Sequence, residues 1–332
     1  MGALKWGIIG CGDIANKAIA PAMIGDRHSK LVAFSSHNSK RAEEMREKFG
    51  AEAAYDDLDK LLGDERVEAV YLSSPVYRHC PEAIAAAEAG KHVLCEKPMA
   101  LSTEDCRRMI GAARSNDVHL GVAYFRRFWP KARKMKELMR SGAIGKPLSG
   151  RIRLGGYYDP DKDDPKYWRV RMAQGGGGAL QDVGSHRLDV MCHLLGEPQQ
   201  VAGMADTLTM NYEVPDTETL ICQFANGAQL VCETYWNVPQ SLDEFEVRGS
   251  NGTLVATPFD GPKLVLDKYG ETEQFETPLP AGIKHQALIE DFSEAIDEGR
   301  TPGFDGYDGM LATAIIAGAY RSWESGEWEK AL

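Results

Sequence analysis

Short apolar runs alternate with helical patterns over residues 1–123. Runs rich in Val, Ile and Leu predict strands, and the segments between them space their apolar residues as helices do. The predicted strands are Leu4–Ile9, Leu31–Ser36, Val67–Ser74, His92–Glu96 and Val118–Ala123. The predicted helices are Ile14–Met23, Ser39–Phe49, His79–Ala89 and Thr103–Ser115. Because parallel strands need crossover connections, this alternation predicts a parallel sheet with helices on both faces.

The pattern changes after about Tyr124, where longer stretches of alternating apolar and polar residues follow a basic helix at 130–140. Asn226-Gly227 and Asn251-Gly252 lie between such stretches, and Asn-Gly is a strong hairpin signal. The predicted strands are Leu148–Tyr157, Glu218–Phe224, Gln229–Trp236, Phe245–Arg248 and Lys263–Asp267. We expect a mostly antiparallel sheet that carries on one face a helix beginning near Gly178. Two helices, Gln286–Glu298 and Tyr307–Ser325, close the chain.

These two patterns predict two domains, as does a length of 332 residues, which is too long for one core. The first covers residues 1–123 and the second residues 124–332, with the option that the C-terminal helix packs back on the first domain. The predicted fold class is α/β: a doubly wound parallel sheet, then an α/β domain with a large, mostly antiparallel open sheet. The Pro- and Asp-rich segment 159–166 is expected to be the most mobile loop.

The formal net charge of −11 argues against nucleic acid and anionic membranes as partners, so we expect a small-molecule partner. No stretch approaches the roughly 20 apolar residues that span a membrane. The apolar stretch Leu4–Ile9 leaves no room before it for a leader peptide, and we expect a cytoplasmic protein. The seven cysteines form no C-x-x-C pair and are odd in number, which predicts buried, reduced thiols.

A glycine turn follows the first predicted strand and opens the first helix. Its sequence, Gly10-Cys11-Gly12-Asp13-Ile14-Ala15, is the G-x-G-x-x-A form of the dinucleotide-binding fingerprint. Glycines allow the tight turn and let the backbone approach a pyrophosphate, while the helix N-terminus provides N–H donors and partial positive charge. The turn therefore predicts a dinucleotide cofactor.

The end of the second strand indicates which dinucleotide binds. An NAD site usually has an acidic side chain here, which accepts hydrogen bonds from the ribose. This chain instead has hydroxyls and two cations, in the order Ser35-Ser36-His37-Asn38-Ser39-Lys40-Arg41. Cations suit a 2′-phosphate, so we expect NADP, with NAD as the alternative. The competing interpretation is that Lys40 and Arg41 are solvated in the first turn of a helix, although cations are mildly unfavourable there.

Lys97 follows a buried strand and precedes Pro98. Proline biases the preceding residue toward an extended backbone, and ligands of parallel sheets bind beyond the carboxyl ends of the strands. We therefore expect Lys97 to project toward the nicotinamide. The alternative is a surface lysine that is paired with Glu96 and contributes almost nothing to stability.

A second group follows the glycines at 175–178. Asp182 and His186 are four residues apart, so on a helix they share a face, where a carboxylate and an imidazole can move a proton at a substrate hydroxyl. A purely structural hydrogen-bonded pair would have the same sequence. His193 adds no metal site, because three ligands on one helix cannot surround an ion.

Together these residues resemble the glucose-fructose oxidoreductase and inositol dehydrogenase family, often written Gfo/Idh/MocA. The resemblance rests on the glycine turn, on Glu96-Lys97-Pro98 and on the glycine run that leads to Asp182 and His186. It also includes Tyr124-Phe125-Arg126-Arg127, Ile144-Gly145-Lys146-Pro147 and the closing helix with Asp308-Gly309, and so extends over nearly the whole chain.

The resemblance implies a Rossmann domain, and a second domain whose open sheet forms a homodimer or homotetramer. It also implies hydride transfer between a nicotinamide and a carbinol or carbonyl carbon of a sugar, anhydrosugar or polyol. Lys97 would hydrogen-bond the reacting oxygen, and His186 with Asp182 would relay the proton. The residues expected at the cofactor are Gly10, Gly12, Asp13, Ile14, Ser36, His37, Lys40, Arg41, Ser74, Pro75, His79, Glu96, Lys97, Trp168 and Arg169. Those expected at the substrate are Lys97, Tyr124, Arg126, Tyr157, Trp168, Asp182 and His186.

One motif departs from the family. Many members have Thr-Pro-Asn where this chain has Ser74-Pro75-Val76, so a side-chain amide near the nicotinamide ribose is missing. Two alternatives stay open for the function. The substrate could be a dihydrodiol or dicarbonyl compound, or the protein could be a regulator that senses NAD(P) without turnover.

Overall fold

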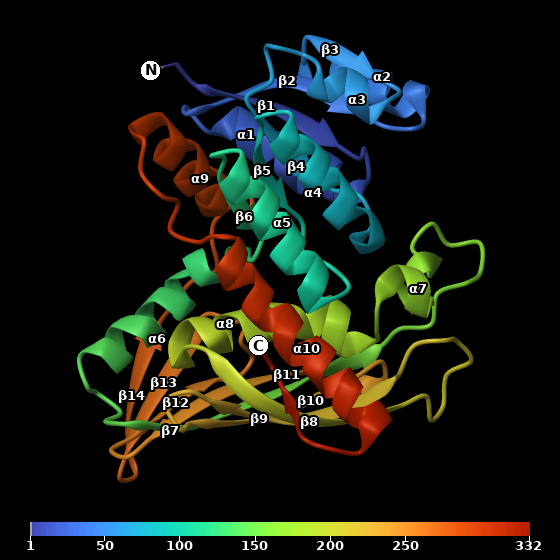
Figure 1. The fold of residues 1–332 in the computed structure, drawn as a ribbon. Helices are drawn as coiled ribbons and strands as arrows, with labels where there is room; N and C mark the ends of the chain where they lie inside the picture. Colours follow the sequence, from blue (N-terminus) through green and yellow to red (C-terminus); the bar gives the residue numbers. More distant parts are fainter. Residues whose placement is uncertain (1) are drawn as a thin grey trace. The chain divides into compact units, whose positions relative to one another are not determined.

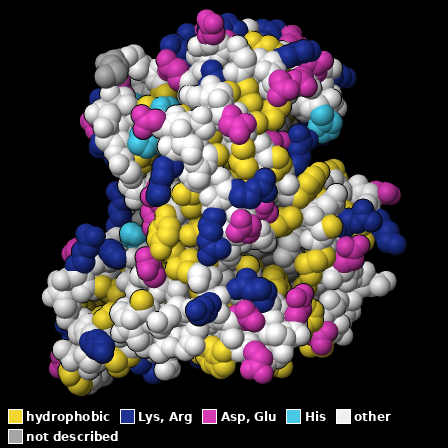
Figure 2. Space-filling model, viewed as in Figure 1, with side chains coloured by type: hydrophobic (Ala, Val, Ile, Leu, Met, Phe, Trp, Pro, Cys, Tyr) yellow, Lys and Arg dark blue, Asp and Glu magenta, His cyan; other side chains and the backbone are white. Residues whose placement is uncertain are grey.

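The computed structural model describes residues 2–332, which divide into two compact units. Of these residues, the first unit comprises 2–100, 104–125 and 281–310, and the second comprises 101–103, 126–280 and 311–332. Within the described residues, no helix combines the length and the apolar composition that a membrane crossing requires. On the face shown in Figure 2, acidic and basic side chains are interspersed.

A six-stranded parallel sheet forms the centre of the first unit (Figure 1). Its strands are β1 (Leu4–Ile9), β2 (Ser29–Ser35), β3 (Ala53–Tyr55), β4 (Ala69–Leu72), β5 (His92–Cys95) and β6 (Leu120–Val122). The strand order β3-β2-β1-β4-β5-β6 changes direction between β1 and β4. In a doubly wound sheet this switch point is where ligands bind.

The crossover segments of this unit are mostly helical. They are η1 (Ala15–Ile19, a π-helix), α1 (Ala20–Gly25), α2 (Ser39–Phe49), α3 (Leu58–Leu62), η2 (Val76–Arg78), α4 (His79–Glu88) and α5 (Thr103–Ser115). Helix α2 begins where the Asn38 side chain accepts a hydrogen bond from the N–H of Arg41, and it ends at Gly50 in the left-handed conformation. Both ends thus follow the residue preferences for helix caps.

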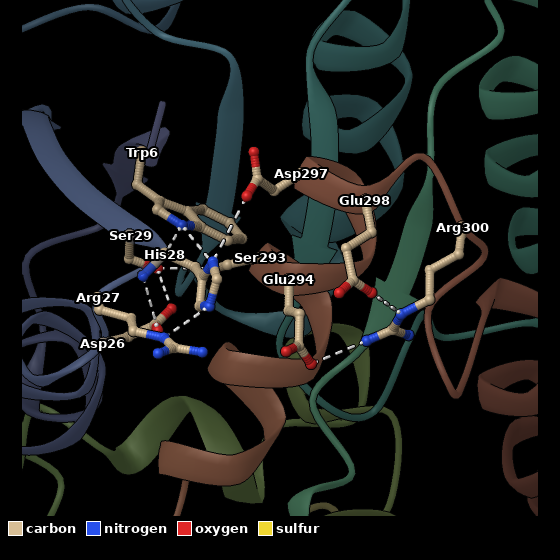
Figure 3. Close-up of polar contacts among 10 residues, drawn as sticks. All are labelled: Trp6, Asp26, Arg27, His28, Ser29, Ser293, Glu294, Asp297, Glu298 and Arg300. Carbon is tan, nitrogen blue, oxygen red and sulfur yellow. Dashed lines mark hydrogen bonds and ion pairs between the residues drawn. The ribbon is translucent and has the colours of Figure 1, made fainter. Parts of the chain in front are cut away.

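Helix α9 (Gln286–Glu298) packs on β1 and β2 although it lies far along the chain. The buried rings of Trp6 and Phe292 have their centroids 5.5 Å apart. Figure 3 shows the polar contacts beside them, where the Trp6 indole N–H donates to the hydroxyls of Ser29, at 3.1 Å, and Ser293, at 3.3 Å. The buried indole N–H therefore has hydrogen-bond partners, as buried polar groups usually do.

A nine-stranded sheet forms the second unit, in the order β14-β13-β12-β11-β7-β10-β9-β8-β15. The strands are β7 (Pro147–Tyr157), β8 (Pro198–Asp206), β9 (Thr217–Phe224), β10 (Gln229–Tyr235), β11 (Asn237–Gly249), β12 (Thr253–Ala256), β13 (Lys263–Lys268), β14 (Glu271–Glu276) and β15 (Glu329–Lys330). All neighbours pair antiparallel except β7 and β10. The predicted fold class is therefore confirmed.

Helices lie over one face of this sheet, and no helix of the described residues covers the other face (Figure 1). The helical segments are η3 (Phe125–Phe128), α6 (Pro130–Arg140), η4 (Tyr167–Val170), α7 (Met172–Gly175), η5 (Leu180–Gly184, a π-helix), α8 (Ser185–Leu195) and α10 (Gly306–Ser325). Strands β9 and β10 alternate accordingly: Leu220 and Leu230 are buried on the helical side, while Ile221 and Val231 are each 42% exposed. This alternation is typical of an open sheet.

Candidate active site

The glycine turn lies at the switch point of the parallel sheet. Gly10 has a φ of +94°, and a Cβ there would come within 3.0 Å of the Ser73–Ser74 backbone. This position therefore needs glycine for the fold itself. A Cβ at Gly12 would meet nothing within 4 Å, so open space lies against the backbone where the helix begins. The turn fits a pyrophosphate, which needs such a close approach to backbone N–H groups.

The loop after β4 faces the glycine turn. The Ser73 hydroxyl donates to the carbonyl of Gly10 at 2.6 Å, and the Ser74 hydroxyl donates to the buried carboxylate of Glu82. His79 is 1% exposed, with its ring nitrogens 2.8 Å from the carbonyl oxygen of Ser74 and 3.0 Å from that of Pro98. Burial lowers the pKa of His79, which favours the neutral ring. His79 thus ties the Ser74 loop to the segment after Lys97.

Lys97 is held through its backbone. The buried Glu96 carboxylate accepts hydrogen bonds from the Tyr71 hydroxyl at 2.6 Å and from the Lys97 N–H at 3.0 Å. Burial, with the charge of Glu96, raises the pKa of Tyr71 well above its ordinary value and keeps the hydroxyl as a donor. The Lys97–Pro98 peptide bond is cis. Glu96 therefore fixes the turn at Lys97 from within the unit.

The end of β2 holds the residues expected to select the cofactor. The Ser36 hydroxyl accepts from the N–H of Asn38 at 3.2 Å, and residues 35–41 include no carboxylate. Burial raises the pKa of the Cys11 thiol to about 11, and the positive charge of Arg41 works against this increase. Arg41 thus acts against the effect of burial on this thiol. The Lys40 ammonium instead lies 3.9 Å from the Glu44 carboxylate, and both side chains are exposed.

The remaining cofactor candidates of the first unit lie around the same turn. Ile14 caps η1, and the Asp13 carboxylate lies 3.2 Å from the Lys17 ammonium. Pro75 has an extended backbone before η2, and His37 is exposed after Ser36. Asp13 and Pro75 directly follow Gly12 and Ser74, and His37 directly follows Ser36 at the end of β2.

The catalytic candidates of the second unit lie on one continuous helical segment. Asp182 lies in η5 and His186 in the first turn of α8, where His186 is 8% exposed. The Arg169 Nε lies 3.4 Å from the Asp182 carboxylate, and its guanidinium is 5.0 Å from the centre of the Trp168 ring. The Trp-Arg pair and the acid, distant in sequence, are thus brought together. π-Helical turns occur frequently at functional sites.

The other substrate candidates are placed differently. The Arg126 guanidinium binds both carboxylate oxygens of Asp260, at 2.9 and 2.6 Å. Tyr124 is 2% exposed, whereas Tyr157 is 67% exposed at the end of β7. Tyr157 therefore has the exposure that a substrate contact needs, while Arg126 has a structural ion pair in this unit.

Sequence reasoning did not single out several side chains that shape these loops. Tyr71 and Glu82 orient Glu96 and Ser74, and Arg187, next to His186, bridges Asp243 at 2.8 Å and Asp260 at 2.9 Å. Their partners lie between 8 and 73 residues away in sequence, so no local spacing identifies them. Tyr71 is the one exception, as a polar ring in an otherwise aliphatic buried strand. Across residues 2–332, no group of three or more His, Cys, Asp or Glu side chains could hold a metal ion.

Comparison with known proteins identifies the family. Residues 4–124 match a model described as an oxidoreductase family with an NAD-binding Rossmann fold, and residues 132–255 match the GFO/IDH/MocA C-terminal domain. The chain belongs to this family. The resemblance inferred from the motifs is therefore confirmed, and the protein is an NAD(P)-dependent oxidoreductase.

Individual relatives align along nearly the whole chain. Myo-inositol 2-dehydrogenase of Thermotoga maritima is 31% identical, over 97% of this chain and 96% of its own length. The 1,5-anhydro-D-fructose reductase of Ensifer adhaerens is 29% identical, over 99% of both chains. The structure of a levoglucosan dehydrogenase in complex with NADH superposes with a TM-score of 0.90 at 26% identity, over 99% of each chain.

Proposed function

We propose that this oxidoreductase prefers NADP and acts on a carbinol or carbonyl carbon of a sugar, anhydrosugar or polyol. The substrate class follows from relatives that act on inositol, anhydrofructose and levoglucosan. The cofactor preference rests on the missing carboxylate at residues 35–41 and on Arg41 in the first turn of α2, close after the end of β2. A guanidinium can bind a 2′-phosphate through charge-assisted hydrogen bonds, and a carboxylate would repel that phosphate.

Lys97 and His186 are the proposed proton-handling residues, with Asp182 as their partner. The nicotinamide supplies or accepts the hydride when it is bound. Lys97 donates a hydrogen bond to the reacting oxygen, and His186 gives or takes the proton on that oxygen. Asp182 carries negative charge beside His186 and also holds Arg169, so it links the proton donor to the loop with Trp168.

One observation carries the proposal. The strand that ends at Cys95 delivers Lys97 to the carboxyl edge of the parallel sheet. Glu96 fixes the Lys97 N–H, and His79 ties the carbonyl of Pro98 to the loop that faces the glycine turn. A lysine that served only as a surface charge would need no such support. The support therefore favours a reactive lysine over one loosely paired with Glu96.

The test is NADPH oxidation with a panel of ketoses, aldoses, anhydrosugars and dicarbonyl compounds, together with the reverse reaction on polyols and dihydrodiols. We expect turnover with at least one sugar-like compound. Lys97→Met should lower kcat by about two orders of magnitude, as loss of positioned proton transfer does. Fluorescence titration should show that the variant still binds NADPH.

Two results would contradict the proposal. A protein that binds NADPH and turns over no member of the panel would be a cofactor sensor, not an enzyme of this class. Turnover confined to dicarbonyls or dihydrodiols would exclude sugars as the substrate class, while the reaction would still be hydride transfer with a nicotinamide.

We also propose that the open face of the large sheet forms a homodimer or homotetramer interface. On this face Ile221 and Val231 are directly paired across β9 and β10, and both are exposed. Neighbouring apolar side chains on an uncovered sheet face favour burial against another protein surface. The charged pair Arg151 of β7 and Glu233 of β10 lies on adjacent central strands, with atoms 3.5 Å apart.

A further inference from the structure

Two side chains outside the predicted site hold the glycine loop at 176–178. Glu218 of β9 is 2% exposed, and its carboxylate accepts hydrogen bonds from the N–H of Leu180 at 2.7 Å and from the hydroxyl of Thr234 at 2.9 Å. The hydroxyl of Tyr320, from α10, donates to the other carboxylate oxygen and accepts from the N–H of Gly178 at 3.1 Å. The pair thus reaches both sides of the turn into η5.

Glu218 acts as the cap of the helical segment that carries Asp182 and His186. This segment begins after Ala179 with no side-chain cap of its own, because the residues before it are glycines and alanine. A helix start leaves N–H groups without partners and carries partial positive charge. A carboxylate delivered from a strand 38 residues further along the chain satisfies one of these donors and opposes that charge.

The glycine run allows the backbone to close on this pair. A Cβ at Gly177 would overlap the Tyr320 hydroxyl, and a Cβ at Gly178 would overlap the carbonyl oxygen of Pro215. Gly177 also has a φ of +156°, and Gly176 has a φ of +79°. The glycines and the Glu218–Tyr320 pair therefore form one structural unit, in which the loop has room for nothing larger than hydrogen.

The donors around Glu218 also set its charge. Three hydrogen bonds from Tyr320, Leu180 and Thr234 favour the ionised carboxylate, while burial disfavours it and raises the pKa of Glu218 to about 7. Burial, together with the Glu218 charge, raises the pKa of Tyr320 well above its ordinary value, so the phenol keeps its proton and stays a donor. The network is complete only with both groups in place.

We propose that Glu218 and Tyr320 are positioning residues, which set the glycine loop and the first helical turn so that Asp182 and His186 present their side chains to the substrate. The inference rests on the proposed function, because that function gives Asp182 and His186 their roles. Neither Glu218 nor Tyr320 handles a proton of the reaction.

The experiment compares Glu218→Gln, Tyr320→Phe and the double variant with wild type. Tyr55→Phe is the matched control, because it removes a phenol hydrogen bond to a carboxylate, that of Asp64, in the other unit. Steady-state kinetics gives kcat and the KM for NADPH, and amide hydrogen exchange of the segment 176–186 reports on the loop without any need for turnover. All five proteins are the full chain.

We expect each single variant to lower kcat about 10- to 100-fold, the size of a misplaced catalytic group, with the KM for NADPH within about twofold of wild type. The double variant should lose little more than the worse single variant, because both changes break one network. Exchange in 176–186 should be faster in these variants and unchanged in Tyr55→Phe.

Other outcomes overturn the inference. Faster exchange with an unchanged kcat would show that the pair holds the loop without serving catalysis, and unchanged exchange would show that it does not hold the loop. A wild type without turnover would overturn the proposed function and the catalytic half of this inference. The exchange result would still decide whether the pair positions the loop.

Discussion

Arg41 and Lys40 are neighbours in sequence and differ in what surrounds them. The Arg41 charge acts on the Cys11 thiol in the glycine turn, whereas the Lys40 ammonium lies beside Glu44 on the surface of α2. A 2′-phosphate at the end of β2 is therefore expected to interact more strongly with Arg41 than with Lys40, whose charge is partly offset by Glu44. Two adjacent cations, equivalent in the sequence, are expected to contribute unequally to cofactor choice.

Arg41→Ala should reduce kcat/KM with NADPH by about 10- to 100-fold, because a charge-assisted hydrogen bond contributes roughly 1.5–3 kcal/mol. The value with NADH should change by less than about threefold. Lys40→Ala is the matched control and should have a small effect with either cofactor, because its charge is screened by solvent. Kinetics with both cofactors checks this prediction, and an equal loss with NADPH and NADH would contradict it.

The role of a residue was predictable from the sequence where the backbone conformation at that position requires one residue type. Gly10 illustrates this, since its left-handed φ and its contact with the Ser73–Ser74 backbone exclude a side chain. The supports of Lys97 were not predictable, because Tyr71 and His79 meet Glu96 and Pro98 only through the packing of neighbouring strands. That Lys97 and His186 serve the same reacting oxygen stays a prediction.

At the scale of elements, strong periodicity gave accurate boundaries. The helices at 39–49, 103–115, 130–140 and 286–298 begin and end where the apolar spacing indicated. The sequence pattern did not predict β3, α3, α7, β8, β12, β14 and β15, most of which are short, and β14 is mostly exposed. Short or exposed segments have few apolar positions, so their pattern is indistinct and only sheet pairing reveals them.

The expected helix from Ile14 to Met23 is also more complex than predicted. The structure begins it as a π-helix over 15–19 and continues it as α1, and the segment after Ala179 begins in the same way. Apolar spacing does not distinguish a π-helical turn from an α-helical one over so few residues. Both π-helical turns follow glycine segments that we place in the candidate site.

Strands β5 and β6 carry a titratable pair near their amino ends. His92 Nδ1 accepts the N–H of His119 at 3.0 Å, and the two rings stack with their centroids 5.3 Å apart. Burial, reinforced by His119, lowers the pKa of His92 from 6.5 to about 4. Protonation of His92 would remove this acceptor. At a pH between about 4 and 6.5, His92 therefore binds fewer protons in the folded state than in the unfolded state.

The free energy of unfolding should therefore fall as the pH decreases from about 6.5 toward 4. His92→Asn keeps an acceptor oxygen and does not titrate, so it should show a shallower fall over this range. Because the pKa of His92 changes from 6.5 to about 4, its contribution to the fall in the free energy of unfolding is at most roughly 3 kcal/mol. Urea denaturation at several pH values measures it, and parallel curves for the two proteins would exclude His92 as the source.

At the scale of the whole molecule, the uncovered sheet face is expected to determine assembly. Ile221→Lys would place a charge in the centre of the proposed interface and should shift the protein toward monomer in analytical ultracentrifugation. Ile24→Lys is the matched control, since Ile24 is 57% exposed on α1 and lies outside the sheet. If both variants kept the oligomeric state of the wild type, another surface would have to form the assembly.

Neither unit is one continuous stretch of the chain. Residues 281–310 belong to the first unit, although all of the second unit's sheet strands except β15 precede them in sequence. The pattern of strands and helices predicted two kinds of architecture. It did not indicate that α9 packs on β1 and β2, because an amphipathic helix does not specify which sheet it covers.

This interleaving has a consequence for synthesis on the ribosome. Trp6 leaves the exit tunnel early, yet Phe292 and Ser293, which cover it, are translated when most of the chain has already emerged. The final strand of the other unit, β15, comes later still. Each unit must therefore wait for segments that are made late, and part of its core stays exposed to solvent until then, which favours aggregation of the incomplete chain.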